Sequence, residues 1–325
     1  MAESMLTVSS APHIRGRLTT PTVMRDVVIA LVPACAAGVY FFGARALVSL
    51  AAGVVGAVGA EYIFEKLGGR PVTIGDWSAV VTGMLLAMVL PPSVPWWILM
   101  LSAAFTIGVV KLLFGGLGFN VFNPALAGRA FAVSAWSALA STGYVWPASA
   151  GAANWVSGFD AVSTATPLTL LKMGEIGGTQ MTRFYAPLFF GNVAGSLGET
   201  SAVALLIGGL YLLWREHISL RIPAVYILTV AVVTALYGQD PLFHVLSGGL
   251  ILGAFFMATD YVTSPMNAVG QIIFAVGCGV LTALIRLFGG YPEGVAYSIL
   301  LMNAFVPLID RSFRPKRFGE VKARG

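Results

Sequence analysis

The sequence predicts an all-α, polytopic integral membrane protein with about ten transmembrane helices in two inverted five-helix repeats. Three observations lead to this fold: a strongly apolar composition, a succession of apolar segments, and motifs that recur half a chain apart. Of the 325 residues, 57% are hydrophobic and only 10% are charged, whereas soluble globular domains carry roughly 25% charged residues. The net charge of +5 is interpreted as a basic excess in cytoplasmic loops, so no nucleic-acid partner is expected.

The apolar segments determine the order of the elements. Several of them are shorter than the roughly 20 residues that a spanning helix needs. We expect helices over residues 24–43, 46–64, 76–91, 96–114, 122–140, 201–214, 222–238, 242–259, 268–288 and 294–310. The predicted domains are an N-terminal segment (1–23), a first five-helix repeat (24–140), a long connection (141–200), a second five-helix repeat (201–310) and a basic tail (311–325).

The distribution of Lys and Arg predicts which connections face the cytoplasm. Basic residues cluster before the first apolar segment, after the last one, and in the alternate connections between them. Cytoplasmic loops of membrane proteins are enriched in Lys and Arg. We therefore expect both termini in the cytoplasm and the connection 141–200 on the non-cytoplasmic face.

Two motifs recur in the same order about half a chain apart. Lys111-Leu-Leu-Phe-Gly-Gly resembles Arg286-Leu-Phe-Gly-Gly, and the stretch from Val81 resembles the stretch from Leu246. Such self-similarity indicates duplication, and five intervening segments would invert the second copy across the membrane. Bundles of this kind hold ligand or ion sites near the interface of their halves. Chance similarity between Gly-rich and Leu-rich stretches is the alternative.

The long connection contains the polar stretch Asp160-Ala-Val-Ser163-Thr164-Ala165-Thr166-Pro167. A residue before proline favours an extended backbone, and proline suits the first position of a helix. Thr166 is therefore predicted to cap a helix that begins at Pro167. A hydroxyl there faces unpaired N–H groups and a partial positive charge, which favour a phosphate. An ordinary helix cap is the alternative, and the aromatic residues of the connection predict an ordered cap domain.

Charged side chains within apolar segments are costly and are commonly functional. Arg129, Asp260, Glu61 and Glu199 are candidates for an ion path, although interhelical pairing of Arg129 and helix capping by Asp260 are alternatives. Glu65, one turn after Glu61, is expected to snorkel at a helix end.

A further helix is expected to begin at Pro124, with Asn120 and Asn123 near its positive end. The scattered histidines and the two distant cysteines indicate neither a metal site nor a disulfide. Cys35 and Cys278 are interpreted as packing residues.

These residues resemble the family of membrane flavin subunits found in the Rnf complex and in the sodium-pumping NADH:quinone reductase. The likeness covers nearly the whole chain. Only a few residues precede the Pro-His-Ile element, which favours Rnf-type D subunits over the quinone-reductase subunits. The motifs that carry the likeness are Asp160-x-x-Ser163-x-Ala165-Thr166, Ser10-Ala-Pro-His13-Ile, Ala79-Val-Val-Thr-Gly83 with Leu90-Pro-Pro-Ser, Gly116-Leu-Gly-Phe-Asn120-Val-Phe-Asn123-Pro124-Ala, Gly195-Ser-Leu-Gly-Glu199-Thr-Ser, and Ala258-Thr-Asp260-Tyr-Val-Thr-Ser-Pro265.

The resemblance implies that Thr166 carries FMN through a phosphoester bond, with Asp160, Ser163 and Ala165 completing the motif. Thr164, where the family commonly has Gly, is a rival attachment site. The resemblance further implies riboflavin bound non-covalently in the bundle, with Asn120 and Asn123 as candidate contacts. A flavin transferase would attach the FMN outside the cytoplasm.

By the same resemblance, A-, B-, C-, E- and G-type subunits would complete a complex in a bacterial inner membrane. That complex would couple electron transfer between ferredoxin and NAD to Na⁺ or H⁺ movement, and this chain alone would lack a complete activity. A secondary transporter or channel is the alternative function, because inverted repeats also build transporters. A transporter would not need the Thr166 motif.

Overall fold

The computed structural model describes residues 18–141, 143–144, 147, 165–177, 181–290 and 293–313. Within these ranges the chain forms helices joined by turns, without any strand, and each predicted apolar segment contains a helix. The all-α fold is therefore confirmed. In chain order the elements are α1 (Thr20–Phe42), α2 (Ala44–Leu67), η1 (Ile74–Asp76), α3 (Ser78–Met88), α4 (Trp96–Phe105), η2 (Thr106–Leu112), α5 (Pro124–Ala135), α6 (Ser137–Ala140), α8 (Pro167–Lys172), α9 (Thr182–Phe190), α10 (Ala202–Trp214), α11 (Arg221–Leu236), α12 (Pro241–Leu246), α13 (Leu250–Leu252), η4 (Gly253–Met257), α14 (Ala268–Phe288) and α15 (Val295–Ser312).

The helices differ in length more than the apolar segments suggest. Among the described residues, α1, α2 and α14 are long and apolar enough to cross a membrane, and α3, α4 with η2, α10 and α11 are shorter apolar helices. The expected helix over 242–259 is broken, because Gly248 and Gly249 both have positive φ between α12 and α13. Discontinuous helices of this kind line ligand and ion sites in repeat-built membrane proteins.

The packing partners of the first half recur in the second half. Helix α2 packs against α3 and α4, and α11 packs against α12, η4 and α14. The two halves are joined where α1 packs on α10 and α5 packs on α15. This recurrence agrees with the duplicated motifs, while the domain boundaries and the inversion of the second half remain predictions.

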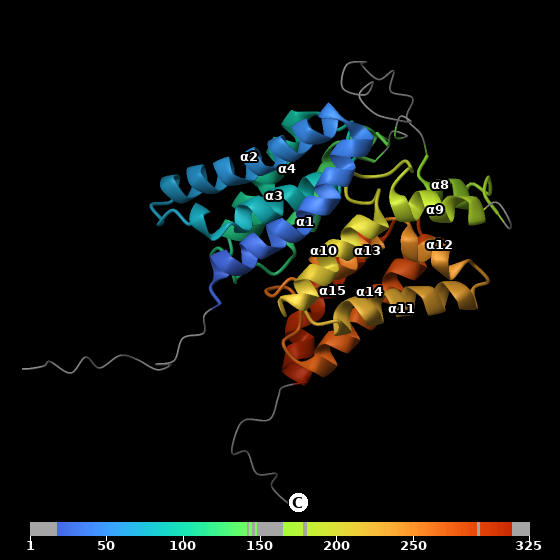
Figure 1. Ribbon diagram of the computed structural model, residues 1–325. Coiled ribbons are helices and arrows are strands. Elements are labelled where there is room, and N and C mark those ends of the chain that lie inside the picture. Colours follow the sequence, from blue (N-terminus) through green and yellow to red (C-terminus); the bar gives the residue numbers. More distant parts are fainter. Residues whose placement is uncertain are drawn as a thin grey trace, which may run out of the picture.

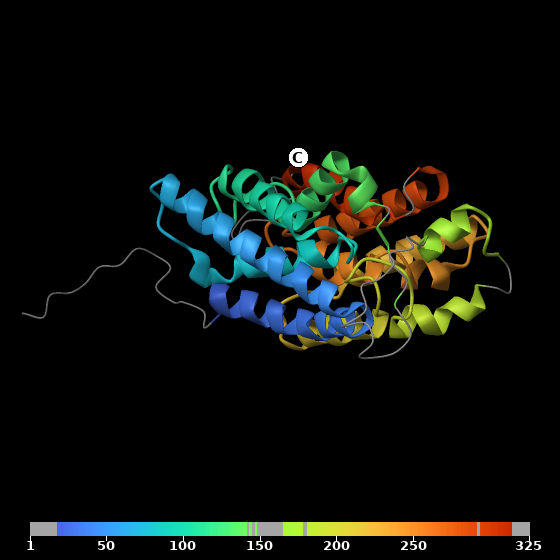
Figure 2. The same ribbon diagram turned by 90° about the horizontal axis from the view of Figure 1, so that it is seen from above.

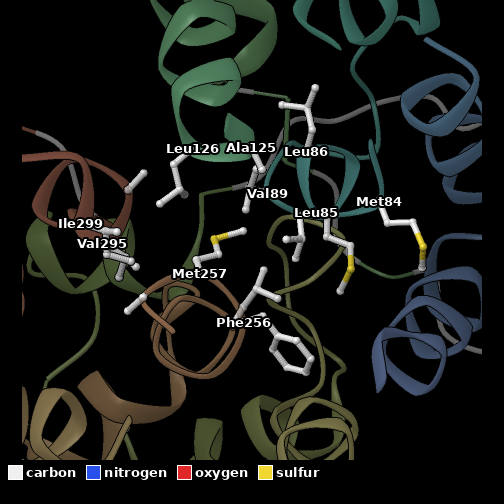
Figure 3. Close-up of a cluster of buried hydrophobic side chains, with 14 of the residues drawn as sticks. Met84, Leu85, Leu86, Val89, Ala125, Leu126, Phe256, Met257, Val295 and Ile299 are labelled. Carbon is white, nitrogen blue, oxygen red and sulfur yellow. The ribbon is translucent and has the colours of Figure 1, made fainter. Parts of the chain in front are cut away.

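The core lies between the two halves. Side chains of α3, α5, η4 and α15 point toward one another there (Figure 3). Leu86, Leu126 and Ile299 are at most 1% exposed in this cluster. Moving one CH₂ group out of water into a protein interior gains about 0.8 kcal/mol. In a membrane the gain is smaller, because lipid tails are as apolar as these side chains, and close packing then holds the two halves together.

Helices α8 and α9 lie at one end of the bundle. In Figure 1 the start of α1 and the end of α15 lie at the opposite end, and Figure 2 also shows the start of α1 far from α8 and α9. Helix α9 packs on α10 and α12 at its end of the molecule. The described helices of the connection between the halves therefore lie away from both ends of the described chain. Which end faces the cytoplasm remains a prediction.

Helices α5, α8 and α12 begin in the same way. Asn123, Thr166 and Asp240 each precede a proline at the first helical turn, and each side chain accepts a hydrogen bond from a backbone N–H of that turn. A cap that accepts an orphan N–H and a proline that lacks one both suit a helix start. The predicted starts at Pro124 and Pro167 are confirmed.

Candidate functional site

Thr166 is the N-cap of α8, with an extended backbone (φ −66°, ψ 157°). Its Oγ1 accepts a hydrogen bond from the backbone N–H of Thr169 at 3.4 Å and lies 2.9 Å from the Thr169 hydroxyl. Thr166 is 4% exposed. Of the other motif residues, Ala165 is described, and Asp160, Ser163 and Thr164 lie outside the described residues.

A buried arginine lies where α14 meets the break between α12 and α13. Arg286 is 3% exposed and donates hydrogen bonds to the carbonyl oxygens of His244, Ser247, Gly248 and Glu293 at 2.5–3.2 Å. His244 is 2% exposed, and neither of its ring nitrogens has a hydrogen-bond partner among the described residues. We call Arg286, His244 and the turn 247–249 the α14 corner.

Helix α8 contacts the α14 corner at Gly248 and the end of α14 at Gly289. A Cβ on Gly248 would collide with the side chain of Leu168, so α8 fits closely because residue 248 has no side chain. Four residues further along α8, the Lys172 ammonium donates to the carbonyl of Gly289 at 2.6 Å. Burial, and then the positive charge of Arg286, lower the pKa of Lys172. The charge of the α14 corner therefore acts on the helix that Thr166 caps.

A second buried network joins the two halves near the same end. Arg129 of α5 forms ion pairs with Glu293 and, at 3.6 Å, with Glu199. Tyr144 donates from its hydroxyl to Glu293 at 2.8 Å. The pairing interpretation of Arg129 is thus confirmed, and Glu199 belongs to the same network. Two carboxylates share one guanidinium here.

A pocket between the halves contains Asn123 and Asp260. Side chains of α1, α3, α10 and η4 and of the connection between α10 and α11 also line it. Asn123 uses its Oδ1 to cap α5 and its Nδ2 to reach the Met257 carbonyl at 3.3 Å. Asp260 accepts from the Thr263 hydroxyl at 3.0 Å, which closes a turn and caps no helix.

Asn120 lies three residues before Asn123, the N-cap of α5. It is 5% exposed, and its Nδ2 donates to the carbonyl of Phe122 at 3.2 Å. Its Oδ1 has no hydrogen-bond partner within the described part of the chain. A buried acceptor without a donor costs free energy.

Glu61 and its neighbours form a cluster at the end of the bundle opposite α8. Glu61 is 0% exposed and pairs with the buried Lys111, whose ammonium also donates to Ser78 Oγ at 2.6 Å. The other oxygen of Glu61, Oε2, has no partner among the described residues. The expectation that Glu65 snorkels is wrong, because Glu65 is 2% exposed and accepts two hydrogen bonds from Thr73.

Sequence reasoning missed a further network at this opposite end. Asp26 is 3% exposed, accepts from Arg215 at 2.9 Å, and lies 2.7 Å from the Nε2 of His217. It joins α1 to the connection between α10 and α11. The signal in the sequence was an acidic residue inside the first apolar segment. Glu293 and His244 were also missed as site residues, although Glu293 lies in the motif that follows Arg286.

A family described as the NQR2, RnfD, RnfE family matches residues 7–319. The chain belongs to this family. Members of the NQR2, RnfD, RnfE family from several bacteria match this chain over almost their whole length. The D subunit of a Na⁺-translocating ferredoxin:NAD⁺ oxidoreductase complex from Acetobacterium woodii is 51% identical, with 100% of this chain and 98% of the relative covered.

Two other relatives in the NQR2, RnfD, RnfE family are also similar over almost their whole length. The D subunit of a proton-translocating ferredoxin:NAD⁺ oxidoreductase complex from Clostridium ljungdahlii is 46% identical, covering 98% of this chain and 97% of the relative. The D subunit of an ion-translocating oxidoreductase complex from Halorhodospira halophila is 40% identical, covering 96% and 95% respectively. The relatives' names differ in the ion, so identity to them does not decide which ion this chain serves.

Proposed function

We propose that this chain is the D-type membrane subunit of an Rnf-type complex and carries FMN on Thr166 through a phosphoester bond. The observation that supports the attachment is the Thr166 cap of α8, in which the Thr169 N–H and hydroxyl already lie toward Oγ1. A phosphate on that oxygen would accept these donors in place of Oγ1. The relatives that match the chain end to end are named as D subunits of such complexes.

FMN would supply the electron transfer, and the protein would anchor and surround it. Thr166 would be the covalent anchor, with Asp160, Ser163 and Ala165 forming the recognition motif for a flavin transferase. The described residues fit the group in one further respect, because the α14 corner provides a buried positive charge beneath α8. No side chain of this chain needs to act as a nucleophile toward substrate.

A second flavin, riboflavin, is proposed to bind in the pocket between the halves. Asn123, which lines this pocket, would contribute the second hydrogen of its Nδ2. Asn120 lies three residues earlier and outside the lining of the pocket, and its unpartnered Oδ1 is the proposed acceptor of a further hydrogen bond. Asp260 lines the same pocket. Electrons would then pass between the α8 end and the interior of the bundle.

The proposed orientation follows the basic residues. Both termini would lie in the cytoplasm of a bacterium, and α8 would face the other side of the inner membrane, where the flavin transferase acts. A-, B-, C-, E- and G-type subunits would supply the remaining redox centres. The complex would couple ferredoxin and NAD chemistry to Na⁺ or H⁺ translocation, and this chain alone would be incomplete as an enzyme.

Glu61 and Asp260 are proposed as polar steps of an ion path. Glu61 has one carboxylate oxygen without a partner among the described residues, whereas Arg129 and Glu199 are engaged in a closed ion network. Glu61→Gln and Asp260→Asn would remove each charge. Full ion pumping by both variants would exclude these two residues from the path.

The test of the attachment is in-gel flavin fluorescence and intact mass on the full chain, co-produced with a flavin transferase. Thr166→Ala should abolish the fluorescent band and the added mass of one FMN less water. Thr166→Ser retains a hydroxyl and should keep part of the signal, and Thr164→Ala is the matched control that should keep all of it. A band that survives Thr166→Ala and disappears in Thr164→Ala would move the site.

A wild-type chain without covalent flavin would favour the secondary transporter or channel. That alternative needs no redox group, and its support rests on the repeat architecture alone. The relatives' names as oxidoreductase subunits favour the redox function over it.

A further inference from the structure

A cavity of about 310 Å³ lies at the end of the bundle opposite α8, where the connection between α10 and α11 meets the segment that joins η4 to α14. We call it the end cavity. Its lining includes the polar residues Glu216, Ser219, Ser264 and Gln271. Glu216 is exposed, so the end cavity communicates with the outside of the molecule.

The end cavity and the pocket between the halves share a wall. His217, Ile218, Thr259 and Tyr261 line both of them. The Tyr261 hydroxyl donates a hydrogen bond to the His217 carbonyl, which joins the two segments of this wall. Of the four side chains, only the imidazole takes up and releases protons near neutral pH. His217 therefore stands where a proton would pass from one space to the other.

The ring of His217 is held by Asp26 of α1. Its Nε2 lies 2.7 Å from the Asp26 carboxylate, which also accepts two hydrogen bonds from Arg215 at 2.9 and 3.1 Å. An ionised carboxylate has no hydrogen to donate, so Nε2 carries the hydrogen and Nδ1 is the acceptor nitrogen of the neutral ring. A carboxylate that fixes the tautomer in this way leaves the other nitrogen to act as base and acid.

The nitrogen left over, Nδ1, is accessible. Within the described part of the chain, the His217 ring has one hydrogen bond, that of Nε2 to Asp26. The sealed, unpartnered polar atoms of this part include both ring nitrogens of His244 but not Nδ1 of His217. Nδ1 is thus open to a cavity that His217 lines, whereas the His244 ring is closed off.

The charged groups around His217 mostly favour a proton on its ring. Glu216 and Asp260 are the other charged residues in the described walls of the two spaces, and carboxylates attract a proton to a nearby imidazole. Arg215 opposes the proton, but two of its N–H groups are given to Asp26. The remaining polar groups on the surrounding elements are neutral: the hydroxyls of Tyr211 and Tyr261 and the amide of Gln271.

We propose that His217 transfers protons from the end cavity to the pocket between the halves and there protonates the second flavin when it is reduced. The destination of the proton rests on the proposed function. The electron comes from the other redox centres of the proposed complex. The N–H bond at Nδ1 of the imidazolium breaks and one forms on the flavin ring, which leaves a neutral imidazole with Nε2 still bonded to Asp26. A proton from outside water then returns to Nδ1 through the end cavity.

A first test needs no flavin and follows the ring nitrogens by NMR on the full chain labelled in its histidines. The chain contains 3 histidines, so the His217→Gln spectrum assigns the signals. The His217 ring should carry its hydrogen on Nε2 alone at high pH and should gain one on Nδ1 as the pH falls. Asp26→Asn should give a mixture of both tautomers. A neutral ring with its hydrogen on Nδ1, or one that never gains a proton while the chain is folded, would overturn the proposal.

A second test measures how fast dithionite reduces the non-covalent flavin of the full chain in rapid mixing. Thr166→Ala is the background, because it removes the covalent flavin. The proton-coupled step is identified by its slowing in heavy water, and His217→Ala should slow it about a hundredfold. Added imidazole should restore the rate in proportion to its concentration, which a purely structural role would not predict. Ser219→Ala is the matched control, because it changes the same wall without a proton-carrying group.

The outcomes separate this inference from the proposed function. A Thr166→Ala chain without any flavin would contradict the second flavin, and the NMR test would still decide whether His217 exchanges protons. A wild-type rate in His217→Ala, or a slow rate that imidazole does not restore, would overturn the transfer by His217. If His217→Ala does not fold, His217→Gln takes its place, and a wild-type rate in that variant overturns the proposal equally.

Discussion

The two halves of the molecule each bury a cation at the corresponding place of a repeated motif, and they hold it differently. Lys111 forms an ion pair with Glu61 and a hydrogen bond with Ser78. Arg286 has only backbone carbonyls as hydrogen-bond partners among the described residues. Both positions contact the third apolar segment of their own half.

The two cations differ in where the nearby carboxylates are directed. At the Lys111 end, Glu61 pairs with the buried lysine itself. At the Arg286 end, the carboxylates of Glu293 and Glu199 pair with Arg129 instead. The fold therefore satisfies one buried cation with a carboxylate and the other with carbonyl dipoles.

The largest effect that separates the two cations is expected from Lys111→Met. Removal of one partner from a buried ion pair leaves an uncompensated charge and typically costs about 3–5 kcal/mol. Glu61→Gln combined with Lys111→Met should restore most of that stability, because no buried charge then remains. The measurement is thermal or SDS-induced unfolding of the full chain in detergent micelles.

The matched cycle uses Arg286→Met with Glu293→Gln. The carboxylate of Glu293 does not bond Arg286, so this pair should show a coupling of less than about 1 kcal/mol, whereas Lys111 and Glu61 should couple by more than about 2 kcal/mol. Equal coupling energies in the two cycles would mean that the two cations are compensated alike, and the comparison would fail.

A smaller effect is expected within the network of Arg129. Its guanidinium hydrogen-bonds Glu293 and lies 3.6 Å from Glu199. Double-mutant cycles with Arg129→Met should therefore give about 1.5–3 kcal/mol of coupling for Glu293→Gln and under about 1 kcal/mol for Glu199→Gln. The same unfolding assay reports both values. A larger coupling energy for Glu199 than for Glu293 would show that the longer of the two ion pairs contributes more to stability, which would contradict this prediction.

Local features of these sites were predictable from sequence, and distant pairings were not. The Thr166 and Asn123 caps depend on a proline that follows directly, so neighbouring residues decide them. The partner of Arg129 is Glu293, 164 residues away, and that of Asn123 is Met257, 134 residues away. Such pairs depend on how the two halves pack, which no local rule contains.

Two other failures have the same physical origin. Glu65 was expected at a lipid-facing helix end, but the connection after α2 folds back and Thr73 bonds its carboxylate. The break at Gly248 and Gly249 lies within a continuous apolar run, so hydropathy alone predicts one helix there. The adjacent glycines were a signal, but whether they bend a helix depends on α8 and Arg286, which occupy the space beside them.

The halves also differ in how their second helices pack, and this predicts the smallest effect. In α2, a Cβ on Gly53 would lie 2.5 Å from the Gly83 carbonyl of α3, whereas a Cβ on Gly59 would meet nothing within 4 Å. In the second half the glycine lies on the partner helix: Gly279 of α14 leaves room for Thr229 of the second helix, α11. Close helix contacts in membranes commonly depend on such small residues.

Gly53→Ala should therefore destabilise the full chain by about 1–3 kcal/mol, because backbone and side chains must move apart. Gly59→Ala, in the same helix, is the matched control and should stabilise it by about 0.5–1 kcal/mol through helix propensity alone. Gly279→Ala should resemble Gly53→Ala if both halves use one glycine to seat their second helix. A neutral Gly279→Ala beside a costly Gly53→Ala would show that α11 and α14 can move apart where α2 and α3 cannot, because the Thr229 Cβ that the new methyl group would meet does not move when its side chain rotates.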